Sequence, residues 1–453
     1  MASSSKFQTI HGEDIISSLP NSLLCHILSF LPTKFVVATS TLSTRWKDIW
    51  PSIPNLDFDD SLFLNPLIDR INPRERQSFM NFVDRVLGFR DRSITLNSFS
   101  LSCSGNCEFI RVSKWVCTAV AQNAKEIKLG LNLRDPFALP REIFLCQSLM
   151  VLELNWKILV DVSQEVCFSN LKVLSFYGVK FFSCECLETI LGGCPVLEDL
   201  VIRKCRWVRG DTWKICGSAL KKLILDWHAV VRVQHECGIV IDAPALECLH
   251  IKDYTSENFL VKNLGSLVEA NVDVAQKFES FVPVGVYGNS VFDLLKGICT
   301  VKFLSLSGDT MEAISHAYDY KFPTFFNLIR LEISVDAWSG WTLLANLLAS
   351  SPFLQSLVFV EGLVQYFNSH FDLSWSPPQH VPPCLSSHIK EIEIRKFRGV
   401  AEELTLVKYL LKNAKVLKKM SIDCSYMKED LKIQKKLHRF HRVSTSCHLD
   451  LII

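Results

Sequence analysis

The sequence predicts an α/β repeat solenoid, with one strand and one helix per repeat, preceded by a small N-terminal all-α module. Three observations lead to this prediction. An apolar-x-x-apolar-x-apolar pattern recurs along most of the chain, helical apolar stripes precede several of its copies, and residues 11–50 lie outside the pattern. With 48% hydrophobic and 21% charged residues, the 453-residue chain is globular in composition and has enough apolar material for a large core.

The recurring pattern predicts the strands. Its clear copies are Leu149/Leu152/Leu154, Leu171/Leu174/Phe176, Leu197/Leu200/Ile202, Leu220/Leu223/Leu225, Leu246/Leu249/Ile251, Val301/Leu304/Leu306, Leu328/Leu331/Ile333, Leu354/Leu357/Phe359, Ile389/Ile392/Ile394 and Leu417/Met420/Ile422. Weaker copies are Ile53/Leu56/Phe58, Leu96/Phe99/Leu101, Ala124/Ile127/Leu129 and Leu267/Ala270/Val272. The middle residues advance by about 27 positions per copy, within the period of roughly 20–29 residues typical of leucine-rich repeats. The last two residues of each copy flank a single position, which is the alternation of a strand.

Apolar trios at spacings of three and four predict a helix before some of the strands. They are Leu187/Ile190/Leu191, Leu344/Leu347/Leu348 and Val407/Leu410/Leu411, and each is followed by a break of small residues or proline. A helix–break–strand unit buries its apolar face only by stacking on its neighbours, so we expect a curved solenoid with strands on the concave side and helices outside. Two longer inserts, residues 278–291 and 363–383, are expected to be loops on one face, where binding sites often lie.

The N-terminal module is expected to contain three short helices. Pro20 suits the first turn of a helix, and Pro32 is expected to end it. The apolar stripe between them consists of Leu23, Leu24, Ile27, Leu28 and Leu31. A second helix is expected through Val36 and Val37, and a third over residues 42–50. Three such helices bury little surface, so the module is marginal alone and is expected to need a partner.

The N-terminal segment LPNSLLCHILSFLPTKFVVATSTLSTRWKDIW, residues 19–50, resembles an F-box of the plant type. Asn21 stands where that family commonly has Asp, a mild departure because Asn also caps helices well. Residues 381–422 resemble the FBD module of the same plant family, with Phe397, Gly399, Glu403 and Leu404 among the matching residues. With the repeats between them, we expect a disordered tail at residues 1–10, an F-box at 11–50, leucine-rich repeats at 51–376 and an FBD domain at 377–453 that contains the last repeats and a C-terminal cap.

This resemblance implies a subunit of an SCF-type (Skp–cullin–F-box) ubiquitin ligase. By this resemblance, the F-box is expected to bind a Skp-type adaptor, and through it the cullin and RING subunits. The physical argument agrees with this, because an amphipathic helix set requires a complementary apolar groove. The residues expected to make this contact are Leu19, Pro20, Leu24, Ile27, Leu28, Leu31, Pro32 and Trp46. The alternative, that apolar residues such as Leu23, Trp46 and Trp50 pack on the first repeat, stays open.

A target protein is expected to bind the strand face of the solenoid. Residues between the buried anchors point to the opposite face of the sheet, because side chains alternate along a strand. This rule selects Asn155, Tyr177, Arg203, Asp226, His250, Lys252, Arg330 and Glu332 as candidate substrate-binding residues. A solvated sheet face is the alternative for each of them. The mixture of both charges suits a protein or a small polar ligand better than a polyanion.

Composition and motifs argue against several other classes of protein. Lys+Arg and Asp+Glu number 49 and 47, so the chain lacks the basic excess expected of a nucleic-acid binder. No GxxxxGK[ST], HExxH or GxSxG motif occurs, so we expect no catalytic residues and no cofactor. The 17 cysteines are interpreted as reduced core thiols of a cytoplasmic or nuclear protein. Cys103/Cys107 and Cys184/Cys186/Cys194 lack a second pair at zinc-finger spacing, so no metal site is predicted.

The apolar stretch over residues 337–360 is interpreted as a broken helix followed by a strand, and we expect no membrane span. The favoured function is a non-enzymatic substrate adaptor of ubiquitin ligation. A repeat scaffold that binds a partner without ligase assembly is the alternative, and adaptor co-purification separates the two. A hydrolase hidden among the Cys and His residues is a third possibility, which stoichiometric zinc in the purified protein would revive.

Overall fold

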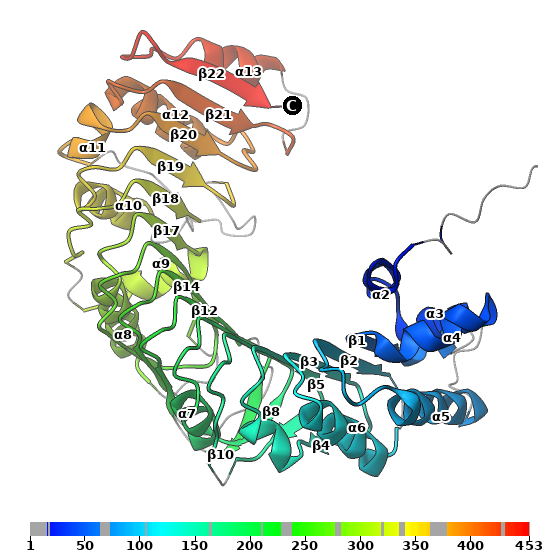
Figure 1. Cartoon of the computed structure of the whole chain (residues 1–453). Helices are drawn as coiled ribbons and strands as arrows, with labels where there is room; N and C mark the ends of the chain where they lie inside the picture. The colour runs from blue at the N-terminus through cyan, green and yellow to red at the C-terminus, as the bar shows by residue number, and fades with distance from the viewer. Residues whose placement is uncertain are drawn as a thin grey trace, which may run out of the picture. The chain divides into compact units, whose positions relative to one another are not determined.

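The structure is a computed structural model in which the chain divides into two compact units, Met1–Lys157 and Ile158–Ile453 (Figure 1). The described residues are 16, 19–63, 73–104, 107–162, 165–209, 212–227, 238–276, 282–318, 321–334, 340–362, 378–426 and 431–452. The predicted tail, residues 1–10, lies outside them.

The first unit begins with a helical module of short helices. These are α2 (Asn21–Leu28), α3 (Thr33–Ala38) and α4 (Thr44–Ile49), with 3-10 turns η1 (Thr39–Thr41) and η2 (Trp50–Ser52). Helix α2 ends at Leu28, three residues earlier than the apolar stripe suggests, and Pro32 instead precedes α3. A proline disfavours helical backbone in the residue before it, so Leu31 cannot continue the helix. The three predicted helices are therefore present, with α2 shorter than expected.

The rest of the first unit is a parallel sheet with helices. Its strands β1 (Asn55–Asp59), β2 (Ser98–Cys103), β3 (Glu126–Leu131) and β5 (Val151–Trp156) pair in that order. The other elements are η3 (Asp60–Phe63), α5 (Pro73–Phe89), α6 (Phe109–Ala121), β4 (Phe137–Ala138) and η4 (Arg141–Leu145). The predicted anchors face each other across neighbouring strands, in the row Leu56, Phe99, Ile127 and Leu152. All four are buried, so the weaker copies of the pattern form strands as predicted.

Arg90 is a buried cation whose hydrogen bonds connect the segments that precede the first strands of this sheet. Its side chain is 3% exposed and donates hydrogen bonds to Gln122 Oε1 (2.5 Å) and to the carbonyl oxygens of Ile94 (2.8 Å) and Ile53 (3.4 Å). Burial lowers the pKa of the guanidinium, but these acceptors compensate for the water it has lost.

We expect Arg90→Leu to lower the free energy of unfolding by about 3 kcal/mol, because buried acceptors left without a donor cost about 1–3 kcal/mol each. Thermal unfolding followed by circular dichroism measures the loss. The matched control is Arg92→Leu, since Arg92 is exposed, and it should change stability by no more than about 0.5 kcal/mol. Equal melting temperatures for the two variants would contradict a stabilising role for Arg90.

The second unit contains one long parallel sheet. Its strands, in spatial order, are β7 (Val173–Tyr177), β9 (Asp199–Arg203), β12 (Lys222–Trp227), β14 (Cys248–Asp253), β16 (Glu269–Val274), β17 (Phe303–Leu306), β18 (Arg330–Ile333), β19 (Ser356–Phe359), β20 (Glu391–Ile394), β21 (Lys419–Asp423) and β22 (His448–Ile452). Strands that follow one another in the pattern are neighbours in space, which is the arrangement predicted for stacked repeats. The predicted middle anchors form one register row from Leu174 to Met420, and Leu449 of β22 extends it.

The three predicted helices of this unit are confirmed as α7 (Cys184–Gly192), α10 (Gly340–Ala349) and α12 (Ala401–Asn413). Helices α8 (Val284–Gly297), α9 (Gly308–Ser315), α11 (Pro383–Ser387) and α13 (Leu431–His438) complete the set among the described residues. In Figure 1, α8, α10, α11 and α12 lie on one side of the main sheet of this unit. Helix α10 followed by β19 confirms the broken helix and strand predicted within residues 337–360.

The middle of the second unit departs from the predicted pattern of one helix per repeat. There the segments between main strands form further strands, β6 (Ile158–Val160), β8 (Lys180–Ser183) and β10 (Arg206–Arg209) in one sheet, and β11 (Thr212–Cys216), β13 (Gly238–Asp242) and β15 (Asn258–Lys262) in another. The repeats are short here: about 21 residues separate Leu249 from Ala270. A strand and two turns leave too little chain for a helix, because an extended segment spans the same distance with fewer residues.

The insert at residues 278–291 was expected to be a loop, and for residues 284–291 this is wrong. Helix α8 starts at Val284 and buries Tyr287 and Val291. Gly288 allows the close approach of α9, since a Cβ there would lie 2.6 Å from the carbonyl oxygen of Ala313. The second predicted insert is residues 363–383. Its first part, residues 363–377, lies outside the described residues.

The segment that resembles an FBD module is organised around a buried carboxylate. Glu403, on α12, is 0% exposed, and its Oε2 accepts hydrogen bonds from the backbone N–H of Arg398 (2.9 Å) and of Gly399 (2.8 Å). Gly399 has a φ of 78°, a left-handed conformation that glycine adopts without strain. These two residues of the FBD resemblance therefore fix the turn that leads into α12.

Candidate partner-binding surfaces

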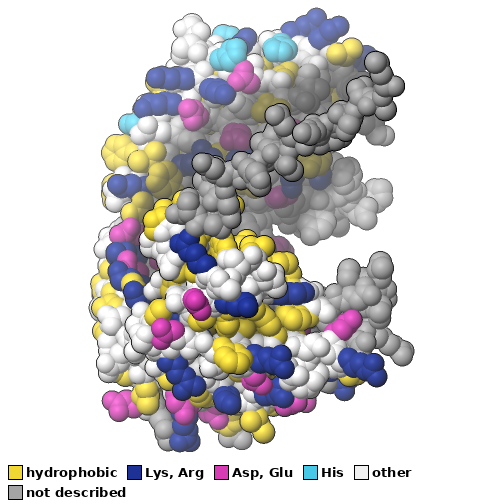
Figure 2. Space-filling view, turned by 45° about the vertical axis from the view of Figure 1, so that its right-hand side comes forward, with side chains coloured by type: hydrophobic (Ala, Val, Ile, Leu, Met, Phe, Trp, Pro, Cys, Tyr) yellow, Lys and Arg dark blue, Asp and Glu magenta, His cyan; other side chains and the backbone are white. Residues whose placement is uncertain are grey.

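The helical module exposes several large apolar side chains. Ile27 on α2 is 47% exposed although it follows a completely buried Leu24 by three residues. We define the apolar helix surface as the exposed side chains of α2, of the turn after it and of α3; its members are Leu23, Ile27, Phe30, Leu31 and Phe35. In Figure 2, which brings this module forward, hydrophobic side chains gather on the surface. Such a cluster on a small module is a feature of protein-binding sites.

Three of the residues predicted to contact an adaptor are instead the core of the module. Leu24, Leu28 and Trp46 are 0%, 2% and 6% exposed, and they pack together in a cluster completed by Val36, Ile49 and Ile53. Their burial contradicts a direct contact with a partner in this conformation. The physical reason is that α4 and the turn after it cover one side of α2, so that only the other side of the apolar stripe faces outward.

The other predicted contact residues are at least partly exposed to solvent. Ile27 and Leu31 are exposed, Pro20 is exposed, and Leu19 and Pro32 are half-buried. Leu19 also packs partly against the module core. These five residues stay candidates for adaptor binding, and the exposed Leu23, Phe30 and Phe35 were not in the predicted set.

Other residues of the F-box resemblance hold the module together. Asn21 does not cap a helix: its Oδ1 accepts hydrogen bonds from Arg45 Nε (3.1 Å) and Nη2 (2.7 Å). Thr33 Oγ1 accepts a hydrogen bond from the backbone N–H of Asp57 in β1 (2.7 Å). Lys34 Nζ donates to the carbonyl oxygen of Leu62 (2.6 Å). The last two contacts attach the module to β1 and to η3.

The second candidate surface is the face of the main sheet of the second unit that points away from the buried anchors. We call it the outward face. Its side chains form three register rows, one of which contains Tyr177, Arg203, Asp226, Lys252 and Asp273 on five successive strands. All five residues are exposed or half-buried. The alternation rule therefore placed Tyr177, Arg203, Asp226 and Lys252 correctly side by side.

The other predicted substrate-binding residues are distributed differently. His250 lies in the middle row, and Arg330 and Glu332 lie together on β18. Asn155 is half-buried on β5, which belongs to the first unit. The structure thus places seven of the eight predicted residues on the outward face of one unit.

Several charges on the outward face form ion pairs. Lys252 Nζ lies 2.9 Å from Asp273 Oδ2, and Arg330 Nη2 lies 2.7 Å from Glu332 Oε1. These groups keep part of their surface in water, and ion pairs near the surface stabilise a fold by only about 0–1 kcal/mol. A bound protein can therefore exchange these pairs for its own charges at little cost, whereas a polyanion would find no excess of positive charge.

A hollow of about 300 Å³ lies on the outward face across β16, β17 and β18. Arg330 and Glu332 line it, together with Glu269, Asn271, Phe303 and Ser305, none of which was selected from the sequence. Phe303 is 41% exposed and supplies an apolar floor for an incoming side chain. The same alternation rule, applied to the weaker copy at Ala270 and to its neighbour at Leu304, would have found them.

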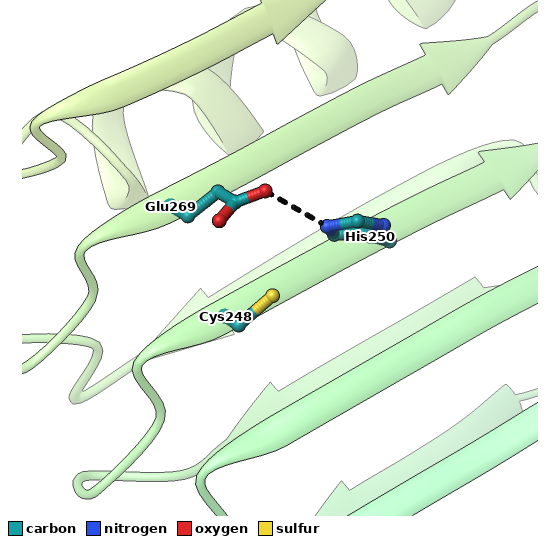
Figure 3. A group of neighbouring side chains, drawn as sticks. All are labelled: Cys248, His250 and Glu269. Atoms are coloured by element: carbon teal, nitrogen blue, oxygen red, sulfur yellow. Dashed lines mark hydrogen bonds and ion pairs between the residues drawn. The ribbon is translucent and has the colours of Figure 1, made fainter.

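Cys248, His250 and Glu269 form a compact cluster beside this hollow (Figure 3). One ligand atom from each lies within 4.8 Å of the others, and His250 Nε2 is 3.2 Å from Glu269 Oε1. Cys248 and Glu269 are register partners on β14 and β16. Burial, and then the Glu269 carboxylate, raise the pKa of the Cys248 thiol, while Lys222 opposes the shift.

The described cysteines are free thiols, and ten of these sixteen are buried. Burial raises the pKa of Cys194 to about 12, and a hydrogen bond with Cys107 followed by burial raises that of Cys103. The interpretation of the cysteines as reduced core thiols fits these ten buried residues, whereas Cys216 is exposed. None of the described helices combines the length and apolar character that crossing a bilayer requires.

Comparison with known proteins identifies the parts of the chain. Residues 16–58 match the F-box domain model, residues 112–278 match the model for the leucine-rich repeats of the FBD-associated F-box protein At5g56370, and residues 377–422 match the FBD model.

Relatives from Arabidopsis thaliana match most of the chain. F-box/LRR-repeat protein At4g14096 is 32% identical over 97% of this chain and 95% of its own length. F-box/LRR-repeat protein At4g14103 is 35% identical over 78% and 93%, and probable FBD-associated F-box protein At1g32375 is 31% identical over 96% and 99%. The chain therefore belongs to the plant family of F-box proteins that combine leucine-rich repeats with an FBD module.

Proposed function

We propose that this protein is the substrate-recognition subunit of an SCF-type ubiquitin ligase. Its F-box binds a Skp-type adaptor, which connects it to cullin and RING subunits, and its repeats bind a target protein. The observation that supports this most is the apolar helix surface: the module has a closed core and still exposes Ile27, Leu31 and Phe30. An apolar helix face of this kind fits a groove on a partner.

The mechanism is proximity. A target held on the outward face of the repeats is tethered to the ligase, which raises the effective concentration of its lysines near the charged conjugating enzyme. The transfer chemistry then belongs to other subunits, and this chain acts as an adaptor in the cytoplasm or nucleus, where thiols remain reduced.

Co-expression with a Skp-type adaptor tests the proposal. We expect a one-to-one complex on size-exclusion chromatography that also incorporates purified cullin and RING subunits. A full-length chain that elutes without the adaptor, while still capturing partners through its repeats, would instead establish the alternative of a scaffold that acts without ligase assembly.

A further inference from the structure

We propose that Cys248, His250 and Glu269 bind a zinc ion on the outward face of the main sheet, with one coordination position left to water. Neither the F-box nor the FBD resemblance includes these residues. The proposal concerns the repeats alone and does not depend on the ligase role.

The backbone already gathers the three ligands. Cys248 and His250 are two positions apart on β14, so their side chains point to the same face. Glu269 is the register partner of Cys248 on the neighbouring β16. In Figure 3 the three side chains converge on one area above the two strands. Ligands supplied by paired strands are held more rigidly than ligands supplied by loops.

The spacing of the ligand atoms fits tetrahedral zinc. Zinc bonds to imidazole nitrogen and to carboxylate oxygen are about 2.0–2.1 Å long, so tetrahedral angles place these two atoms about 3.3 Å apart. The observed separation of His250 Nε2 and Glu269 Oε1 is 3.2 Å. Cys248 Sγ lies within 4.8 Å of a ligand atom of His250 and of a ligand atom of Glu269, so it is near enough to supply the third donor after a small movement of the side chains.

The combination of donors favours zinc over the harder cations. Magnesium and calcium prefer oxygen ligands alone, whereas a thiolate, an imidazole and a carboxylate together suit zinc. A thiolate and a carboxylate also balance its two positive charges. Three protein ligands with a fourth position open are the pattern of zinc sites that accept an exogenous donor. The ligands are half-buried or exposed, so that position is accessible from solvent.

The pair formed by His448 and Asp450 provides an internal comparison. His448 Nε2 lies 2.6 Å from Asp450 Oδ1 on β22, also on the outward face, so an exposed His–carboxylate pair recurs in this sheet. The cluster at Cys248 differs by the addition of a thiol. Variants of the two sites therefore separate a metal site from an ordinary surface ion pair.

Cobalt(II) titration of the metal-stripped full chain, kept reduced, tests the proposal. We expect one ion per chain and a thiolate-to-cobalt charge-transfer band that added zinc removes. Cys248→Ser should abolish the band, and His250→Gln should weaken binding by more than about 100-fold, because loss of an outer-sphere partner alone costs 10–100-fold. His448→Gln and Cys216→Ser should leave the titration unchanged. Absence of the band in the unmodified chain, or its persistence in Cys248→Ser, would overturn the proposal.

A measurement on the unmodified chain avoids any dependence on how the variants fold. Zinc at one equivalent should slow alkylation of Cys248, followed by peptide mass spectrometry, at least tenfold, and should leave the exposed Cys216 unaffected. Equal alkylation rates of Cys248 with and without zinc would overturn the site independently of the spectra.

Discussion

Replacing Ile27 with aspartate should strongly weaken adaptor binding while the protein stays folded. Ile27 lies on α2 and is 47% exposed, so its side chain is available to a partner, and a charge there would be buried without a counter-ion on association. Central apolar contacts of an interface often contribute 2 kcal/mol or more, so we expect the dissociation constant to rise by at least about 30-fold. Isothermal titration of a purified Skp-type adaptor with the full chain gives the value.

The control for this substitution is Ile110→Asp. Ile110 is also an apolar residue on a helix of the first unit, and it is 83% exposed, but it lies on α6, outside the helical module. The same chemical change there should leave both affinity and melting temperature unchanged. Unaltered adaptor affinity in the double variant Ile27→Asp/Leu31→Asp would exclude the apolar helix surface as the binding site and would place the adaptor contact elsewhere on the chain.

The strands were predictable from the sequence because their positions follow from burial alone. Every copy of the pattern buries its last two anchors, as Leu200 and Ile202 do, and stacked repeats require this at a regular interval. The additional strands were not predictable in the same way. Segments such as β13 and β15 belong to no copy of the recurring apolar pattern, so no regular interval marks them as strands.

The exposed residues of the helical module were harder to predict because an apolar stripe does not say which side of a helix is covered. Leu23, Leu24, Ile27, Leu28 and Leu31 share one pattern, yet α4 and the following turn cover only Leu24 and Leu28. That choice depends on a tertiary contact, which helical periodicity cannot reveal. Equally, Cys248 and His250 are adjacent in the pattern, but Glu269 joins them only through the register of β14 with β16.

Replacing Leu24 with alanine should unfold the helical module and leave the repeats of the second unit intact. Leu24 is 0% exposed within a core of only a few residues. Leucine-to-alanine changes in protein cores cost about 2–5 kcal/mol, and a module of three short helices has little stability to lose. Hydrogen exchange measures this directly: α2, α3 and α4 should lose protection, whereas β12 and β14 should keep it.

Leu24→Met is the matched control, because a substitution that conserves volume costs less than about 1.5 kcal/mol. It should retain both protection and adaptor binding. Leu24→Ala and Ile27→Asp should therefore both weaken adaptor binding, the first because the module is unfolded and the second because a folded module has lost its contact. A double aspartate substitution at both positions would mix these causes. Full hydrogen-exchange protection of α2 in Leu24→Ala would contradict the assignment of Leu24 to the core and return it to the set of contact residues.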